Sequence, residues 1–307
     1  MTKREKKTLS VQALHKRGSR HRKMRDWFVH TAYLTPSFAG VMLFFFVPIV
    51  IIAYNSTLKS AVNSQFVGLN NYIRVINNGA FELAAKNTLL FSALAVPLAV
   101  VLSLFLALLL NTQMPARGWF RSVFLNPMMV PVASIVLIWQ VFFSFNGTIN
   151  SYFGGFGMDK IDWMKSDWSR LVILLLFLWK NLGYNMVLFL SALNNVPVEL
   201  IDSAKIDGAG AVKRFLHINI VYLYPTIFFV GIMSLINSFK IFREVYLLTG
   251  DYPFSALYLL QHFMNNAFRD LDYQKLSAAA IIMCIAMILI VGVLFLAENK
   301  LGRDVEE

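Results

Sequence analysis

The chain has 307 residues, of which 57% are apolar or aromatic and only 15% carry a charge. Soluble domains have roughly 45–50% apolar and about 25% charged residues, so a soluble core of this size could not bury so much apolar surface. The 27 Phe, 11 Tyr and 6 Trp exclude a disordered chain. The single cysteine excludes a disulfide framework and a cysteine metal cluster. The class that remains is an integral membrane protein.

Six segments are long and apolar enough to cross a membrane as helices, which requires about 20 mostly apolar residues each. They are Thr35–Ser56, Thr88–Leu110, Phe120–Phe145, Leu171–Leu193, Leu223–Phe242 and Ser277–Ala297. Prolines inside spans, such as Pro97 and Pro131, predict kinked helices that pack around one another. A further short helix is expected outside the membrane, over Ser255–Ala267. The sequence therefore predicts an all-α membrane protein with six spans.

The 28 Lys and Arg residues are unevenly distributed over the two sides that six spans define. Ten of them lie in residues 1–34, and their side carries about twice as many as the other, which places both termini in the cytoplasm. Residues 1–34 are interpreted as a basic cytoplasmic arm and residues 35–307 as the membrane domain. The net charge of +11 could also indicate nucleic-acid binding. Basic residues directly before a span meet anionic headgroups instead, so lipid and not nucleic acid is the expected partner.

The connection between the fourth and fifth spans, about residues 194–222, has the pattern of two short helices. Pro197 and Glu199 mark a helix start, and Gly208 interrupts the apolar pattern where a helix should end. A second helical run is expected over Ala209–Asn219, with Phe215 and Ile218 on one face. On periodicity alone, an amphipathic hairpin at the membrane surface without a partner is an equally good interpretation.

The stretch from Asp202 to Ala209, followed by Phe215, Ile218 and Pro225, resembles the EAA loop of ABC importer permeases. That family pattern is Glu-Ala-Ala, three residues, Gly, nine residues and Ile-x-Leu-Pro; Gly208 and Ile218 fall in register, and Asp202 stands for the Glu. Other stretches are similar to the carbohydrate-uptake branch, which includes the maltose system. They are Phe66–Tyr72, Arg121–Pro127, Trp179–Tyr184 and Tyr246–Gly250.

The resemblance implies a type I ABC importer permease fold in a bacterial plasma (inner) membrane. In that family the loop docks on a cytoplasmic ATPase subunit and transmits its motion, so the chain itself is expected to be a transport subunit and not an enzyme. It would hold no cofactor, because ATP and Mg bind the partner ATPase. The implied partners are a second homologous permease, two ATP-binding subunits and an extracytoplasmic solute-binding protein. The residues implied in ATPase coupling are Glu199, Asp202, Ser203, Ala204, Asp207, Gly208 and Ala209.

Polar residues also gather at similar depth in the fourth and fifth spans, where they are costly unless they face protein or a wet cavity. The predicted substrate-binding residues are Lys180, Asn181, Gly183, Tyr184, Asn185, Ser234, Asn237 and Ser238. Gly183, Ser234 and Ser238 are included because they match the translocation site of maltose-type relatives. The alternative is that the Ser and Asn side chains only join helices by hydrogen bonds.

Lys180 is the unusual residue of this group, since an unpaired lysine at the bilayer centre costs about 2.5–3.5 kcal/mol on the gentlest scale. It is expected to pair with a carbonyl, line the pathway or contact an anionic sugar. Lys240 is expected to extend outward beside Arg243 and Glu244.

The sequence thus predicts ATP-driven import of a carbohydrate, and an anionic carbohydrate is one of the possible substrates. The competing function is a carrier driven by an ion gradient, with Lys180 as its only candidate coupling residue. No metal-ligand or catalytic spacing is present among the five histidines.

Overall fold

The computed structural model describes residues 29–60, 64–112 and 116–306. Six helices in these ranges are long and apolar enough to cross a membrane, which confirms the predicted number of spans. The chain divides into two units, Met1–Asn55 and Ser56–Glu307. Most of the predicted basic arm, residues 1–28, lies outside the described residues. Residues 29–34 belong to the first long helix instead.

The described part of the first unit is one helix, Val29–Asn55. It contains a π-helical turn, η1 (Met42–Phe46), and continues as α2 (Val47–Asn55). Its large apolar side chains, among them Phe44 and Ile51, are mostly exposed. Such a helix is stable only in contact with lipid or with another apolar surface.

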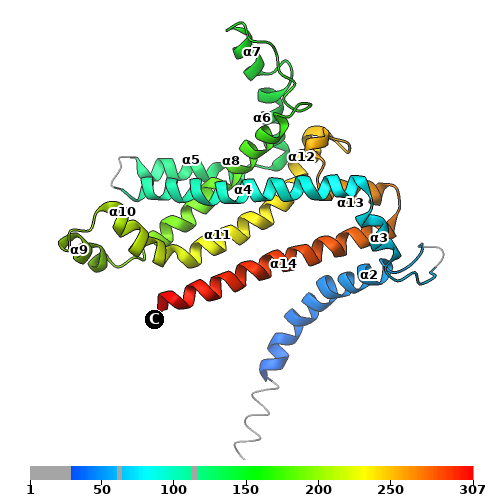
Figure 1. Cartoon of the computed structure of the whole chain (residues 1–307), viewed down its shortest axis with the longest axis horizontal. Helices are drawn as coiled ribbons and strands as arrows, with labels where there is room; N and C mark the ends of the chain where they lie inside the picture. Colours follow the sequence, from blue (N-terminus) through cyan, green and yellow to red (C-terminus); the bar gives the residue numbers. More distant parts are fainter. Residues whose placement is uncertain (1–28, 61–63, 113–115, 307) are drawn as a thin grey trace, which may run out of the picture. The chain divides into compact units, whose positions relative to one another are not determined.

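Two long helices form the centre of the second unit, α4 (Gly79–Asn111) and α8 (Ser169–Leu193) (Figure 1). They make the most extensive helix–helix contact in the described part of the chain. Small buried residues recur every four positions on α4 and allow the backbones to approach closely: Ala95, Ala99, Ser103 and Ala107. The helices α5 (Arg117–Met129) and α11 (Ile220–Lys240) pack against α8.

The predicted continuous third span, Phe120–Phe145, is wrong. The chain forms two helices here, α5 and α6 (Val132–Phe143), followed by the short α7 (Thr148–Gly154). Between α5 and α6, Val130 has an extended backbone with ψ of 132°, because the ring of the following Pro131 disfavours the helical conformation. The stretch long enough to cross a membrane is instead Val132–Gly154.

The connection at residues 194–222 contains one separate short helix rather than two. α9 (Val198–Ile206) ends before Gly208, whose φ of +75° confirms the predicted turn. The predicted separate second helix is wrong, because α10 (Ala211–Arg214) and the π-helical turn η2 (Phe215–Asn219) run without interruption into α11. A single π-helical turn such as η2 is accommodated inside a longer α-helix. The loop therefore connects directly to the fifth span.

The predicted helix Ser255–Ala267 is instead a turn followed by a helix. A 3₁₀ turn, η3 (Ser255–Leu257), precedes α13 (Leu260–Arg269), and both follow α12 (Phe242–Thr249). The break between them is held by α4, because Asn87 Nδ2 donates to the carbonyls of Ser255 and Tyr258 at 2.7 and 3.0 Å. The second unit closes with α14 (Tyr273–Glu306), which packs against α13 and the early helix α3 (Asn70–Ile76).

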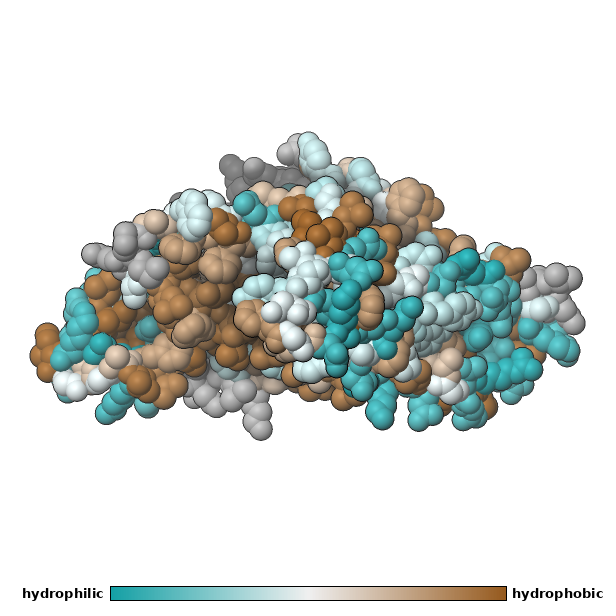
Figure 2. Space-filling model, turned by 90° about the horizontal axis from the view of Figure 1, so that it is seen from above, coloured by the Kyte–Doolittle hydropathy of each residue, from teal (hydrophilic) through white to brown (hydrophobic). Residues whose placement is uncertain are grey.

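Burial differs strongly among the long helices. Half of the apolar window of α8 is buried, against 6% for the window in Tyr273–Glu298. Figure 2 shows broad areas of apolar residues on one face, separate from groups of polar residues. The exposed apolar surfaces are typical of a protein that lipid or other membrane subunits surround, while half of the apolar window of α8 is covered by its own chain.

Candidate functional site

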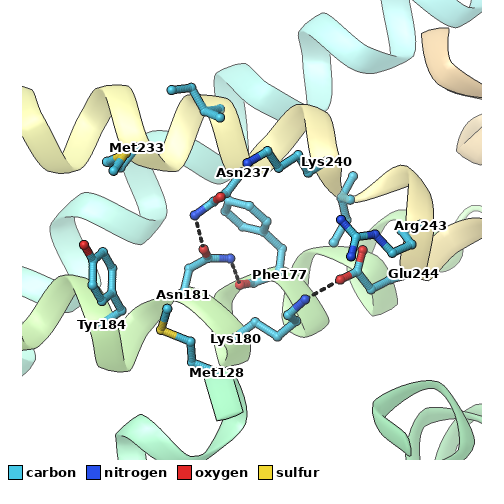
Figure 3. Close-up of a pocket in the computed structure, with 12 residues that line it drawn as sticks. Met128, Phe177, Lys180, Asn181, Tyr184, Met233, Asn237, Lys240, Arg243 and Glu244 are labelled. Atoms are coloured by element: carbon cyan, nitrogen blue, oxygen red, sulfur yellow. Dashed lines mark hydrogen bonds and ion pairs between the residues drawn. The ribbon is translucent and has the colours of Figure 1, made fainter. Parts of the chain in front are cut away.

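A cavity of about 360 Å³ has α8 on one side and the junction of α11 and α12 on the other (Figure 3). Met128 of α5 also contributes to its lining. Its lining residues are Met128, Phe177, Lys180, Asn181, Tyr184, Met233, Ile236, Asn237, Lys240, Ile241, Arg243 and Glu244. On α8 the lining positions are spaced by three and four residues, and the polar positions on α11 and α12 repeat that spacing. This spacing gathers side chains on one face of each helix, so the two polar faces are directed at each other.

Amide groups form a hydrogen-bonded chain across the middle of the cavity. Asn237 Nδ2 donates to Asn181 Oδ1 at 2.9 Å, and Asn181 Nδ2 donates to the Phe177 carbonyl at 2.8 Å. These bonds fix the orientation of both amides. The side-chain oxygen of Asn237 (Oδ1) and the Tyr184 hydroxyl form no hydrogen bond with the described residues, so both are available to a solute.

Lys180 forms an ion pair with Glu244 of α12. The Lys180 side chain is 23% exposed and the Glu244 side chain 5%, so a carboxylate is buried beside the cavity. Lys180 thus pairs with a carboxylate at the cavity, and its predicted roles in lining a pathway or contacting an anionic sugar stay predictions. The sequence analysis missed Glu244 as its partner. The signal that could have found it is the free-energy cost of an unpaired lysine, which calls for a carboxylate nearby.

Lys240 and Arg243 also line the cavity, and both are exposed. Lys240 is exposed and lines the cavity together with Arg243 and Glu244, which agrees with its expected place beside these two residues. Counted at about 1.5 Å per residue, Lys180 is roughly 17 Å from the beginning of α8. That is about the middle of a hydrocarbon layer of roughly 30 Å.

Four of the eight predicted substrate-binding residues lie at the cavity: Lys180, Asn181, Tyr184 and Asn237. The other four are buried between helices. Asn185 Nδ2 donates to Ser234 Oγ at 2.9 Å, which joins α8 to α11, and the Ser238 and Ser92 hydroxyls are 2.7 Å apart, which joins α11 to α4. These contacts match the alternative in which polar side chains join helices.

Gly183 has a packing role in the structure. A Cβ atom at this position would lie 1.8 Å from the carbonyl oxygen of Phe124 on α5. Real atoms never approach so closely, and the obstacle is backbone rather than a flexible side chain. Glycine is therefore the residue that allows α5 to lie against α8.

The predicted coupling residues lie together on α9 and the turn after it. Glu199, Asp202, Ser203, Asp207 and Gly208 are exposed, whereas Ala204 and Ala209 are half-buried. Asp202 pairs with Lys205 at 2.7 Å on the surface. Apolar side chains on this helix are exposed as well, with Ile206 at 88% and Val198 at 63%. Charged and apolar groups side by side without a covering element are typical of a docking surface.

Comparisons with known proteins agree with this arrangement. The family described as "Binding-protein-dependent transport system inner membrane component" matches residues 99–306. The chain is 28% identical over 270 residues to the lactose transport system permease protein of Rhizobium radiobacter, covering 85% of this chain and 91% of that protein. It is 27% identical to the trehalose/maltose transport system permease protein of Thermococcus litoralis, covering 88% and 93%.

A solved structure has the same fold. It is a chain of a bacterial alginate ABC transporter in complex with an alginate pentasaccharide-bound periplasmic protein. The TM-score is 0.79 at 19% identity, with 91% of this chain and 96% of that chain covered. At this identity the likeness concerns the fold alone.

Proposed function

Because this chain belongs to the family of inner membrane components of binding-protein-dependent transport systems, we propose that it is the permease subunit of an ATP-driven importer for a carbohydrate. The observation that carries the proposal is the cavity between α8 and the α11–α12 junction. It offers hydroxyl and amide groups for sugar hydroxyls. It also offers the rings of Phe177 and Tyr184, whose apolar faces suit sugar rings.

The carbohydrate class is carried over from similar proteins. They are named for lactose, for trehalose/maltose and for alginate. The first two are uncharged disaccharides and the third is an acidic polysaccharide. These names support a carbohydrate as the solute and leave its charge open.

The exposed loop supports coupling to an ATPase. The helix α9 presents acidic and apolar side chains, and the turn at Gly208 joins it to α10, which continues into α11. A push on α9 would therefore act on the helix that carries Asn237 and Lys240 at the cavity. In this proposal ATP and Mg²⁺ bind a separate ATPase subunit, and its motion exposes the cavity alternately to the two sides of the membrane.

The assembly that this function requires has two homologous permeases and two ATP-binding subunits on the cytoplasmic side. An extracytoplasmic binding protein delivers the sugar, and both termini of this chain are cytoplasmic. The largely exposed apolar surfaces of Val29–Asn55 and α14 support a second membrane subunit as their neighbour, together with lipid. The predicted coupling residues, Glu199 to Ala209, would contact the ATPase.

Uptake into vesicles tests the proposal. The complete transporter is reconstituted with its binding protein, and the labelled sugar is one that raises the melting temperature of that protein. We expect uptake that requires ATP and survives a protonophore. Uptake that continues without ATP and is lost with the protonophore would instead favour the ion-gradient carrier, with Lys180 and Glu244 as its ionisable pair.

A pair of glycine substitutions tests the coupling loop. Gly208 has a φ of +75°, which a β-branched residue strongly disfavours, whereas Gly210 has a φ of −66°. Neither position has a heavy atom within 4 Å of a new Cβ. We expect Gly208→Val to keep ATP hydrolysis and lose most uptake, while Gly210→Val keeps both. Equal uptake in the two variants would contradict the role of the turn.

A further inference from the structure

The charges at the cavity are unbalanced. Lys180, Lys240 and Arg243 are cationic, and Glu244 is the single carboxylate among the lining residues. Glu244 is already used, because it pairs with Lys180. Lys240 and Arg243 form no ion pair or hydrogen bond with the residues that the structure describes. The cavity therefore carries two positive charges that this part of the chain does not neutralise.

No contact within the described part of the chain accounts for these two cations. Both side chains are exposed in the single chain, yet both line a cavity whose one carboxylate, Glu244, is already paired with Lys180. Lys240 ends α11 and Arg243 lies in the first turn of α12, so two like charges stand close together at the cavity and repel each other. An anion in the cavity would neutralise the two cations and offset their mutual repulsion.

The cavity also has two chemically different ends. Figure 3 shows Lys180, Arg243 and Glu244 together at one end, Tyr184 at the other, and the pair Asn181 and Asn237 between them. A solute that fits this arrangement has hydroxyl groups over most of its length and a negative charge at one position. A wholly uncharged sugar would leave the two cations without a partner.

We propose that the transported carbohydrate is anionic and that Lys240 and Arg243 hold its acidic group in this cavity. The inference rests on the proposed function, since it specifies the substrate class of the same site. A carboxylate matches the fork of the Arg243 guanidinium and the point charge of Lys240. The Lys180–Glu244 pair closes the same end and leaves the two cations to the solute.

The first experiment measures the charge of the cavity without any transport. Within the complete transporter this chain carries Cys284→Ala, which removes its own thiol, and Met233→Cys as a reporter in the cavity; labelling is measured on this chain alone. The rates of modification by sulfonatoethyl methanethiosulfonate, an anion, and trimethylammonioethyl methanethiosulfonate, a cation, are compared. We expect the anion-to-cation rate ratio to fall by about tenfold or more when Lys240→Gln and Arg243→Gln are added.

Two controls separate a local effect from a general one. The pair Lys59→Gln and Arg74→Gln removes two exposed cations that do not line the cavity, and should leave the ratio at the Met233→Cys reporter unchanged. A reporter at the exposed position of Ser64 should not respond to the loss of Lys240 and Arg243. A change of less than twofold at the cavity reporter, or an equal change at position 64, would overturn the proposal.

The second experiment tests the ligand class with a matched pair of probes. Galacturonate and its methyl ester are nearly the same size and differ by one negative charge, and each is used to protect the cavity reporter from N-ethylmaleimide. We expect galacturonate to protect at a concentration at least about tenfold lower, and the difference to vanish without Lys240 and Arg243. Equal protection by both, or by neither up to about 10 mM, would overturn the anionic assignment. ATP-dependent uptake of an uncharged sugar in the same preparation would then still support the importer.

Discussion

The two faces of α8 contain similar polar residues but use them differently. Lys180, Asn181 and Tyr184 are half-buried and line a cavity, whereas Asn185, one position beyond Tyr184, is fully buried and bonded to Ser234. Successive helix positions point about 100° apart, so one residue along the chain is enough to change the environment. A polar residue in a span can therefore either join helices or line a cavity, and its contacts decide which. Substitutions on the two faces should therefore differ in their effects on stability and on uptake.

The largest effect is expected on the packed face, from Gly183→Leu. Since even a Cβ would lie 1.8 Å from the Phe124 carbonyl oxygen, α5 must move away from α8, at roughly 3 kcal/mol or more. We expect little folded protein, measured as the monodisperse fraction after purification. Gly231→Ala is the matched control, because nothing lies within 4 Å of its new Cβ. Normal yield and melting temperature for Gly183→Leu would show that the two helices do not pack as described.

On the cavity face, Glu244→Gln should destabilise the protein by leaving Lys180 without its carboxylate. We expect about 2–3 kcal/mol, below the upper range for fully buried pairs because Lys180 is 23% exposed. The measurement is thermal unfolding in detergent, completed as a double-mutant cycle with Lys180→Met. The double variant should regain part of the lost stability. Additive losses in the cycle would mean that the two residues do not interact.

Acid should destabilise the region around α13 through His262, which is buried and whose pKa burial lowers to about 4. Its Nδ1 accepts a hydrogen bond from the Leu259 amide at 3.2 Å, so the folded protein holds the neutral ring. The unfolded chain takes up a proton below its ordinary pKa of 6.5 while the folded one does not, so stability falls between pH 6.5 and about 4. The loss is about 2 kcal/mol at pH 5.

The control for this pH effect is His262→Gln, which has no group that titrates in this range. Its melting temperature should depend less on pH between 7 and 5 than that of the native chain, even if it is lower throughout. Parallel curves for the two proteins would exclude His262 as the source.

The smallest effects are expected from two asparagines, one packed between helices and one at the cavity. Asn185→Ala removes one buried hydrogen bond to Ser234 and should lower stability by about 1 kcal/mol with uptake retained. Asn237→Leu should leave the melting temperature nearly unchanged and reduce uptake, because Asn237 faces the cavity. Melting curves and vesicle uptake of both variants provide the check. The opposite pattern would reverse the roles that we assign to the two residues.

Sequence reasoning predicted the long helices well because an apolar run of sufficient length is a local property. It also located the turn at Gly208, where the residue itself carries the signal. At Pro131 it predicted a kink in a continuous span, whereas the helix ends there, because the proline disfavours the helical conformation of the preceding Val130. The proline is a local signal, but the apolar length of Phe120–Phe145 outweighed it in the prediction.

The site was predicted only in part, for a different reason. Which face of α8 borders a cavity depends on α11 and α12, more than 50 residues away in the chain, and no local pattern contains that information. The pairing of Lys180 with Glu244 is of this kind. So is the need for glycine at position 183, which follows from the backbone of α5.

Blocking the cavity tests the central claim that the solute passes between α8 and the α11–α12 junction. In the Cys284→Ala background, the reporters at positions 233 and 64 are each labelled with a bulky maleimide, and ATP-driven uptake is measured before and after. We expect labelling at position 233 to abolish uptake and labelling at position 64 to leave it unchanged. Full uptake by a transporter completely labelled at position 233 would contradict the central claim.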